Sequence, residues 1–435
     1  MKNYILVILS LLWCCNSQAQ ISFSLAENNV RQQYSGEEFA TYNIYQFNRV
    51  VSQGENIYTV FDDTIYIANN SYIFFVDKYP QANWMHDCEY LVMDVDNGNI
   101  KKIEHNAPPK NLSFDYNIIK ETSLESPEQI IVKKNPVKNA KLCDDSQKQY
   151  AVIINGGIDV ANNNQRYWND CSFIYTTLIH TYGYKKENIY VLMSDGKDTA
   201  NDMNRGSNIY LSQNLDLDND GIDDIQYAAT KANISMVFDE LSSIMTNGDN
   251  LFIFTIDHGG PNILCLWGEN ISSYEFSQEV NKINPNCLIN IVMGQCYAGS
   301  FEPYLNAPNR VLTFATNDQE NSWGYLNSYD VFVNLITCAL NGYDMSGNPI
   351  SADIDGDNRI TMYEAFEYAK QNDNMSEHPF QVSNNKNLKY ILTLCDAFCH
   401  NNETFLPQEI TSNMTLTSDY YGYGEIVVKS GATRK

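Results

Sequence analysis

Two reactive side chains, a histidine and a cysteine, each follow an apolar segment that is typical of a buried strand. His258 lies near the end of the segment NLFIFTIDHGG, before two glycines, and Cys296 is the last residue of the segment CLINIVMGQC. Sites in parallel sheets form at the carboxyl ends of the strands. If the two strands are neighbours, the imidazole lies beside the thiol and favours the thiolate, which is the form that attacks a carbonyl carbon. The pair therefore predicts nucleophilic catalysis.

Glycines flank both residues and let the backbone approach a substrate closely. Attack on a carbonyl also needs donors for the oxyanion, and the backbone N–H groups of Gly259 and Cys296 are the candidates. The alternative is a structural cysteine near an unrelated turn histidine, and the shared strand-end context favours the catalytic interpretation. His86 and Cys88 lie in a region of short strands without a glycine turn, so we interpret that second pair as structural.

The elements that must position the catalytic pair begin at Tyr150. From there, strand-like apolar segments such as YAVIING and RVLTFATND alternate with helical ones such as RYWNDCSFIYTTLIHTYG. This alternation predicts an α/β domain over residues 149–404, with a mainly parallel sheet flanked by helices. Residues 20–148 hold short alternating segments between turn residues and predict a small β-rich domain. Residues 405–435 resemble the start of a further β segment.

The composition limits the possible functions. The chain has 435 residues, a formal net charge of -25 and 43% hydrophobic residues. This acidity disfavours nucleic-acid binding, and the apolar content excludes a disordered chain. The first residues, MKNYILVILSLLWCCNSQAQ, contain an apolar run of about a dozen residues, which is too short for a membrane span. We expect a signal peptide at residues 1–19 and a secreted, periplasmic or cell-surface protein.

Two details of export stay open. Acylation of Cys14 or Cys15 would make the chain a surface-attached lipoprotein, although Trp13 fits poorly before an acylated cysteine. No later segment reaches ~18 uninterrupted apolar residues, so we expect no transmembrane segment in the mature chain. Apart from Cys296, the mature chain has eight cysteines, which either form disulfides or remain buried thiols. Cys395 and Cys399 are close enough in sequence to be a plausible bridge.

Two Asp-rich loops predict Ca²⁺ binding with a structural role. The first has carboxylates at the first, third, fifth and twelfth positions of an EF-hand-like loop, and Asn where the sixth position is usually Gly. Its predicted ligands are Asp353, Asp355, Asp357, the Arg359 carbonyl, Thr361 and Glu364. The second loop, LDLDNDGIDDIQ, lacks an acidic twelfth residue. Its predicted ligands are Asp216, Asp218, Asp220 and either Asp223 or Asp224.

The segments TIDHGG and IVMGQCYAGSF resemble the two catalytic blocks of the legumain-type cysteine peptidases, in the wider caspase-like clan. The resemblance extends from Tyr150 to about Cys395. It implies a caspase-like fold and a secreted endopeptidase that cleaves protein or peptide substrates through a thioester intermediate. Members of this clan often need proteolytic activation, which favours a pro-domain role for residues 20–148 over a substrate-binding module or a spacer. The Lys-rich stretch 133–148 would be a reachable cleavage site.

The resemblance also implies roles around the dyad. The segment NNNQRYWND matches a family segment in which an Asn supports the catalytic histidine, an Arg lines the specificity pocket and an Asp lies on the helix. These fall on Asn164, Arg166 and Asp170. A Ser-rich pocket wall matches ATNDQENSWGY at Ser322, and the acidic floor of the pocket matches Asp330.

One residue departs from the family pattern. Legumains have an acidic pocket residue directly after the catalytic cysteine, whereas this chain has Tyr297. We therefore expect Tyr297 to line a pocket that differs from one suited to Asn. Two other functions stay open at this point. One is a transpeptidase or ligase of the same clan, and the other is a Ca²⁺-dependent surface adhesion module on an inactive protease fold.

Overall fold

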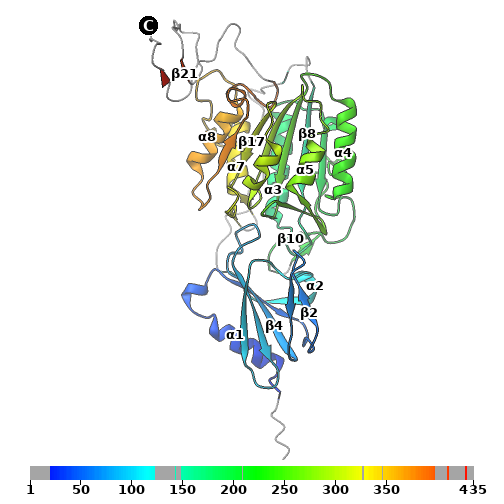
Figure 1. Ribbon diagram of the computed structural model, residues 1–435, viewed down its shortest axis with the longest axis vertical. Coiled ribbons are helices and arrows are strands. Elements are labelled where there is room, and N and C mark those ends of the chain that lie inside the picture. Colours follow the sequence, from blue (N-terminus) through cyan, green and yellow to red (C-terminus); the bar gives the residue numbers. More distant parts are fainter. Residues whose placement is uncertain are drawn as a thin grey trace, which may run out of the picture.

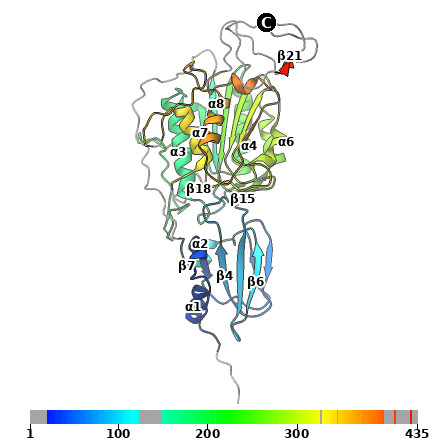
Figure 2. The same ribbon diagram turned by 90° about the vertical axis from the view of Figure 1, so that its left-hand side faces the viewer.

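The computed structural model describes residues 20–122, 143, 148–207, 209–325, 328–344, 346–396, 409–410 and 427–428. Within these ranges the chain forms a β domain and a larger α/β domain, stacked end to end (Figures 1 and 2). The expected signal peptide lies outside the described residues, as do most of the Lys-rich stretch and of the segment 405–435. Of that segment, only the short parallel pair β21 (Glu409–Ile410) and β22 (Val427–Val428) is described.

The β domain is built on an antiparallel sheet of five strands in the order β6-β5-β4-β1-β7. Strands β4 and β5 are mostly apolar and are buried along nearly their whole length, because helix α1 covers one face of the sheet and a hairpin and loops cover the other. The elements are α1 (Phe23–Gln33), η1 (Glu37–Phe39), β1 (Asn43–Phe47), β2 (Asn56–Tyr58), β3 (Thr64–Tyr66), β4 (Ser71–Asp77), β5 (Cys88–Asp94), β6 (Ile100–His105), α2 (Leu112–Asp115) and β7 (Tyr116–Lys120).

The α/β domain is built on a six-stranded sheet in the order β20-β17-β16-β12-β8-β9. Five of its strands are parallel, and β20 runs antiparallel at one edge. The predicted fold class is therefore confirmed: a mainly parallel sheet flanked by helices follows an antiparallel β sheet. The strands are β8 (Gln149–Asn155), β9 (Ile189–Met193), β12 (Asn250–Ile256), β16 (Leu288–Met293), β17 (Arg310–Phe314) and β20 (Phe380–Val382).

Helices cover both faces of this sheet, which explains why its strands read as continuous apolar runs. In β8, Ala151 and Ile153 pack toward α3, α7 and α8, whereas Val152 and Ile154 pack toward α4 and α5 (Figures 1 and 2). The helices and connecting turns are α3 (Gln165–His180), η2 (Lys186–Asn188), α4 (Lys231–Ile244), α5 (Ser273–Val280), η3 (Ala298–Phe301), α6 (Glu302–Leu305), α7 (Val331–Asn341), α8 (Met362–Asn372) and η4 (Leu388–Tyr390).

The strands that carry the catalytic pair are neighbours. β12 and β16 pair in parallel, with Thr255 opposite Met293, so His258 and Cys296 leave the sheet at the same edge. The β domain lies against this edge (Figure 1). Short strands between the main elements line it: β10 (Met203–Asn204), β11 (Tyr210–Leu211), β13 (Gly259–Gly260), β14 (Ile263–Leu266), β15 (Glu269–Ser272), β18 (Gly324–Tyr325) and β19 (Tyr329–Asp330).

The disulfide differs from the one that sequence proximity suggested. Cys395 pairs with Cys143, from which it is separated by 252 residues, and Cys399 lies outside the described residues. This bond joins the end of the α/β domain to the segment before β8. The spacing of cysteines along the sequence cannot predict such a pair, because the two residues meet only when the chain folds. The described cysteines other than this pair are free and buried.

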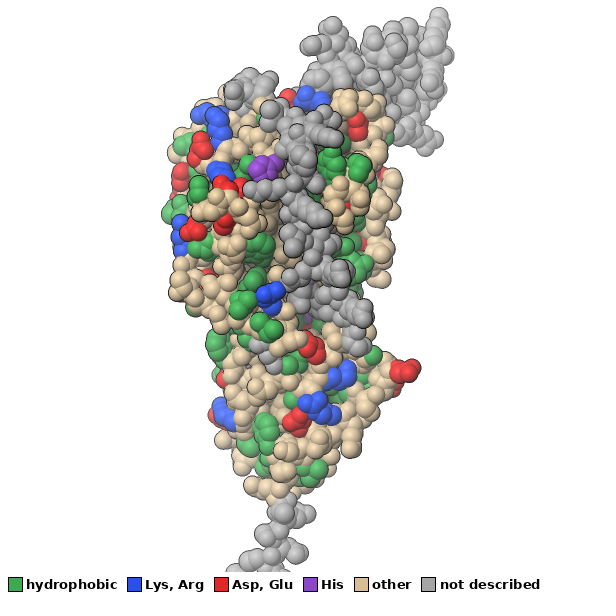
Figure 3. All heavy atoms as spheres, turned by 180° about the vertical axis from the view of Figure 1, so that it is seen from behind, with side chains coloured by type: hydrophobic (Ala, Val, Ile, Leu, Met, Phe, Trp, Pro, Cys, Tyr) green, Lys and Arg blue, Asp and Glu red, His purple; other side chains and the backbone are tan. Residues whose placement is uncertain are grey.

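The surface carries both signs of charge. In Figure 3, acidic and basic side chains are scattered over both domains rather than gathered in one patch. Among the described residues, no helix is long and apolar enough to cross a membrane.

Candidate active site

The side chains of His258 and Cys296 face one peptide unit, which comes from the β domain. The segment that connects β4 to β5 enters the edge of the α/β sheet and brings Asn83 and Trp84 to the dyad. The Sγ atom of Cys296 contacts the carbonyl oxygen of Asn83, and the Nδ1 atom of His258 accepts a hydrogen bond from the Trp84 N–H at 2.9 Å. All four residues are buried. Sulfur and imidazole therefore meet opposite ends of the Asn83–Trp84 peptide bond.

Residues at the start of α3 orient the imidazole of His258. Its Nε2 atom lies 2.8 Å from the Asn162 carbonyl oxygen, and the Tyr167 hydroxyl lies 3.3 Å from the ring. Because Nδ1 accepts a hydrogen bond, Nε2 carries the proton and the ring is neutral. Asn164, the predicted support, acts one step away: its Nδ2 donates to the same Asn162 carbonyl at 3.2 Å.

Burial sets the protonation of the dyad in this arrangement. Removal from water raises the pKa of the Cys296 thiol above its ordinary value, although hydrogen bonds from Ser322 oppose this effect. Burial, followed by the nearby positive charge of Arg166, lowers the pKa of His258 well below its ordinary value. The thiol and the imidazole are therefore both neutral while the β-domain segment covers them.

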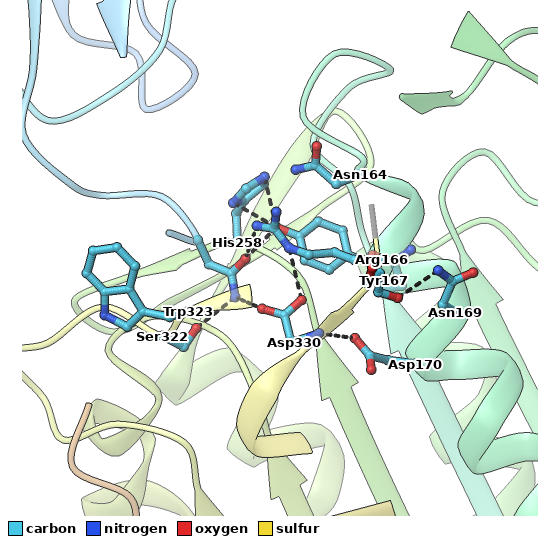
Figure 4. Close-up of polar contacts among 12 residues, drawn as sticks. Asn164, Arg166, Tyr167, Asn169, Asp170, His258, Ser322, Trp323 and Asp330 are labelled. Carbon is cyan, nitrogen blue, oxygen red and sulfur yellow. Dashed lines mark hydrogen bonds and ion pairs between the residues drawn. The ribbon is translucent and has the colours of Figure 1, made fainter. Parts of the chain in front are cut away.

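Beside the dyad, a buried polar pocket encloses the carboxamide of Asn83. The Nδ2 atom of Asn83 donates to Ser322 Oγ at 2.7 Å and to Asp330 Oδ1 at 2.8 Å. Its Oδ1 atom accepts from Arg166 Nη2 at 2.7 Å and from the Tyr167 hydroxyl at 2.5 Å. These four partners use both donors and both acceptor positions of the amide. Figure 4 shows the side chains of Arg166, Ser322 and Asp330 gathered in one place near His258.

A buried ion pair holds the pocket together. Arg166 Nε and Asp330 Oδ2 are 3.1 Å apart, and the Arg166 side chain is 0% exposed. Burial raises the pKa of Asp330, and the charge of Arg166 opposes this shift. Asp170 lies behind the pair, where it accepts a hydrogen bond from the Asp330 N–H at 2.8 Å. The structure thus brings Arg166, Ser322 and Asp330 together, as the resemblance implied, with Asp170 as a support.

The backbone before Asn83 is held like an added strand. The Asn83 N–H donates to the Ser322 carbonyl at 3.0 Å, and the Gly324 N–H donates to the Gln81 carbonyl at 3.0 Å. Between them, Ala82 and Trp323 form an antiparallel bridge. Residue 324 must be small, because a Cβ atom there would lie 2.8 Å from the Arg166 Cδ atom. Main-chain pairing next to a side-chain pocket is how an extended peptide binds to a strand edge.

The predicted oxyanion donors lie on adjacent backbone. A Cβ atom at Gly259 would lie 2.6 Å from the Cys296 carbonyl oxygen, so glycine is needed for this close approach. Their role in binding the oxyanion stays a prediction.

Tyr297 contacts the β-domain segment that covers the dyad. Its hydroxyl donates to the Met85 carbonyl at 3.4 Å, beyond the Asn83–Trp84 bond, and it is not one of the hydrogen-bond partners of the Asn83 carboxamide. The residue adopts a left-handed conformation, with φ of 56°, in the turn after β16.

Sequence reasoning missed several residues of this site. Tyr167 stands next to Arg166 in the sequence, yet nothing in its spacing distinguishes it from a core tyrosine. Asn162 acts through its carbonyl, which leaves no signature in a side-chain pattern. Asn83 lies in another domain, and no local motif marks it. The positive φ of 144° at Asp257, before the catalytic histidine, likewise becomes visible only in the structure.

In the first acidic loop, three of the predicted carboxylates gather. Oxygen atoms of Asp353, Asp355 and Glu364 lie within 4.8 Å of one another, a spacing that fits one shared cation. Asn358 has a φ of 62°, so it adopts the left-handed conformation that the sixth position requires. Asp357 lies outside this cluster, because the turn directs its carboxylate to the Arg359 N–H at 2.7 Å. Thr361 caps helix α8 instead.

The second loop differs more from its prediction. Its clustered carboxylates are Asp216, Asp218 and Asp224, whereas Asp220 and Asp223 lie outside the cluster. After Gly221 the chain turns so that Asp223 is exposed and Asp224 points inward, where it accepts from the Tyr175 hydroxyl at 2.6 Å. The ammonium group of Lys186 also pairs with Asp218 at 3.0 Å and with Asp224 at 3.1 Å. This lysine already neutralises part of the charge that would attract a cation.

Comparisons with known proteins agree with this geometry. The model of the peptidase C13 family matches residues 149–390. A vacuolar-processing enzyme delta-isozyme from Arabidopsis thaliana is 26% identical over 223 residues, which is 46% of this chain and 46% of that protein. A vacuolar-processing enzyme from Vicia sativa is 28% identical over 184 residues, which is 37% of this chain and 36% of that protein. The matched part thus covers less than half the length of each relative.

Proposed function

This chain belongs to the peptidase C13 family, and from that premise we propose that it is a cysteine endopeptidase with Cys296 as nucleophile and His258 as general base and acid. The single observation that supports the proposal best is the position of one peptide unit between the two side chains. Its carbonyl meets Cys296 Sγ and its N–H meets His258 Nδ1 at 2.9 Å. A thiol peptidase attacks the carbonyl carbon of a peptide bond and protonates its nitrogen, so each side chain lies beside the group on which it would act.

The chemistry follows from these positions. His258 takes the thiol proton at Nδ1 as the sulfur adds to the carbonyl carbon, and the N–H groups of Gly259 and Cys296 receive the oxyanion. The same Nδ1 then protonates the departing amine, and water hydrolyses the thioester. The Asn162 carbonyl, 2.8 Å from Nε2, stabilises the imidazolium that exists between the two proton transfers.

The pocket favours Asn on the amino side of the cleaved bond. An Asn carboxamide satisfies Arg166, Asp330, Ser322 and Tyr167 at once, as Asn83 does. An Asp side chain has no donor for Ser322 and would set its carboxylate against that of Asp330. A site built to hydrogen-bond a group rejects analogues that lack it by large factors, because its own buried polar atoms lose their partners. An intact dyad and pocket are not needed in an adhesion module, so we set that alternative aside.

Two further parts of the proposal concern the chain rather than the reaction. The amino-terminal segment MKNYILVILSLLWCCNSQAQ supports export, and we propose a secreted or surface location with proteins or peptides as substrates. We also propose that Ca²⁺ binds the first acidic loop through Asp353, Asp355 and Glu364. There it would fix the turn before α8 and take no part in the reaction.

The proposed reaction is tested with Cys296→Ala and a mixed peptide library. We expect the full chain to cleave after Asn and Cys296→Ala to lose this activity entirely. Cys338→Ala, which changes another buried cysteine in α7, serves as the matched control and keeps the activity. Cleavage by Cys296→Ala at the rate of the unmodified chain would exclude the dyad.

A further inference from the structure

We propose that the chain carries its own substrate: the dyad cleaves the bond between Asn83 and Trp84 in the β domain. This inference rests on the proposed function and extends it to a processing site inside the chain. Three independent features of the structure support it, namely the backbone pairing, the filled pocket and the bracing of the segment from behind.

The segment is bound along its backbone as a substrate would be. Residues 81–83 pair antiparallel with residues 322–324, through hydrogen bonds of 3.0 Å at Gln81 and at Asn83. This pairing fixes the register, so the residue in the pocket is Asn83 and the next peptide bond reaches the dyad. A one-residue shift would turn the Asn83 side chain to the other face of the strand, away from the pocket.

The pocket is filled by the side chain that it fits. Asn83 is 0% exposed, and each polar atom of its carboxamide has two partners. Buried amides generally find partners, so the identity of these partners carries the argument. All four belong to the α/β domain, and Ser322 and Tyr167 also contact Cys296 and His258. The contacts therefore indicate recognition of the amide rather than simple packing of a loop.

The β domain holds the segment rigidly from behind. His86 Nε2 lies 2.8 Å from Asp77 Oδ1, at the end of β4, and the rings of Trp84 and His86 stack at 4.1 Å. Both ends of the segment continue into β4 and β5, which pair with each other over seven residues. The scaffold thus presents a preformed loop, and binding it costs less ordering than binding a flexible peptide.

The proposed step is an ordinary acyl transfer within the chain. Cys296 Sγ adds to the Asn83 carbonyl carbon while its proton passes to His258 Nδ1. The bond from that carbon to the Trp84 nitrogen breaks as His258 returns the proton to this nitrogen. Asn83 remains as a thioester on Cys296, and Trp84 becomes a new amino terminus. Water then hydrolyses the thioester, which leaves a carboxylate on Asn83 and restores the thiol.

Until the bond is cut, the segment fills the site and keeps other peptides out. Cys296 and His258 are fully buried beneath it, and burial keeps both of them neutral. After the cut, β4 still pairs with β5 and β1 still pairs with β7, so the two pieces separate only when both pairings open. Self-cleavage would be the first step of release, and loss of the Asn83 piece would be the second.

The experiment is to incubate the purified full chain between pH 4 and pH 8 and to follow it by intact mass and amino-terminal sequencing. We expect a new amino terminus at Trp84, formed at a rate that is unchanged by tenfold dilution. Cys296→Ala should give no such terminus. A terminus that never forms in the unmodified chain, or one whose rate falls with dilution, would overturn cleavage of the chain by its own site.

Variants of the substrate residue sharpen the test. Asn83→Asp keeps the shape of the side chain but removes its two donors, and Asn83→Gln lengthens it. We expect cleavage at this bond at least 20-fold slower in both variants, while thermal unfolding checks that each is folded. The matched control is Asn97→Gln, an exposed asparagine in the turn after β5, which should be cut at the normal rate. Equal rates in Asn83→Asp and in the unmodified chain would contradict the proposal.

An added Asn-containing peptide separates this inference from the proposed function. If the peptide is cleaved while the Asn83–Trp84 bond stays intact, self-cleavage is wrong and the endopeptidase function stands. If neither bond is cleaved at any pH, both are wrong.

Discussion

At the scale of single residues, the proposed preference for Asn rests on the side chains that surround the Asn83 carboxamide. Ser322 accepts a hydrogen bond from the amide and also donates its backbone N–H to Cys296 Sγ at 3.2 Å. Arg166 and Asp330 contribute charge, but each also holds the other in place at 3.1 Å. The Ser322 hydroxyl is therefore the contact that can be removed with the least damage to the fold.

We expect Ser322→Ala to lower kcat/KM for Asn-containing peptides about tenfold, since a buried amide N–H left without an acceptor costs about 1.4 kcal/mol. Each protein is first incubated until the bond between Asn83 and Trp84 is cut, because the uncut segment keeps peptides out of the pocket. Ser172→Ala, which removes a buried hydroxyl that bonds the Leu217 carbonyl, is the matched control and leaves kcat/KM unchanged. An unchanged kcat/KM in Ser322→Ala would remove Ser322 from the pocket.

The buried carboxyl of Asp202 makes the stability of the fold depend on pH. Asp202 is 0% exposed, and burial, followed by the nearby Asp195, raises the pKa of Asp202 to about 7 from its ordinary 3.8. Because the folded pKa is the higher one, the stability that this group provides is fully present below pH 3.8. It is lost as the pH rises through about 7.

Asp202→Asn removes this titration. We therefore expect the Tm of the variant, relative to the unmodified chain, to increase steadily from pH 4 to pH 8. The exposed Asp318 provides the control, since Asp318→Asn should leave the pH profile of Tm unchanged. A Tm difference between Asp202→Asn and the unmodified chain that is constant over this range would disprove the assignment.

At the scale of elements, the sequence predicts those features that one continuous segment determines. The runs around Ile153, Phe254 and Val292 are apolar on both faces, so a buried parallel sheet follows from them directly. The adjacency of β12 and β16 then brings two strand ends together, and with them His258 and Cys296. The short strands β18 and β19 could not be predicted. They exist because the pocket wall folds against Arg166, a contact between distant segments.

The two acidic loops show the same limit. Both have the spacing of a cation site, but Lys186 enters only the second cluster, from a turn far away in the sequence. Glu364 meanwhile serves two purposes, since it also forms a capping box with Thr361 at the start of α8. Local spacing alone cannot distinguish the two loops.

We expect millimolar Ca²⁺ to raise Tm by a few degrees through the first loop, because a cation that binds only the folded state stabilises it. Glu364→Gln should remove this increase while keeping the capping box, because Gln also serves at that position. Asp218→Asn, in the loop that Lys186 neutralises, should retain the full increase. Differential scanning calorimetry with and without chelator measures the Tm of both variants. A Ca²⁺-dependent increase in Tm that persists in Glu364→Gln would contradict Ca²⁺ binding at the first loop.

At the scale of the whole molecule, the β domain fills the candidate active site with its own residue, Asn83. No pattern within residues 20–122 indicates this, because Asn83 acquires its meaning only from Arg166 and Asp330, more than eighty residues away. Tyr297 contacts the same β-domain segment, through its hydrogen bond to the Met85 carbonyl, and its predicted effect on the pocket stays a prediction. The contacts between the two domains at this site could not be predicted from the sequence.

We propose that Cys296 and His258 cleave peptide bonds after Asn. The most direct test is the set of cut sites that the full chain and Asn83→Ala produce in a mixed peptide library, with Cys296→Ala in parallel. We predict cuts after Asn by the full chain, slower cuts by Asn83→Ala, in which the uncut segment still covers the dyad, and none by Cys296→Ala. Cut sites without Asn on their amino side, or cuts that persist in Cys296→Ala, would contradict the account.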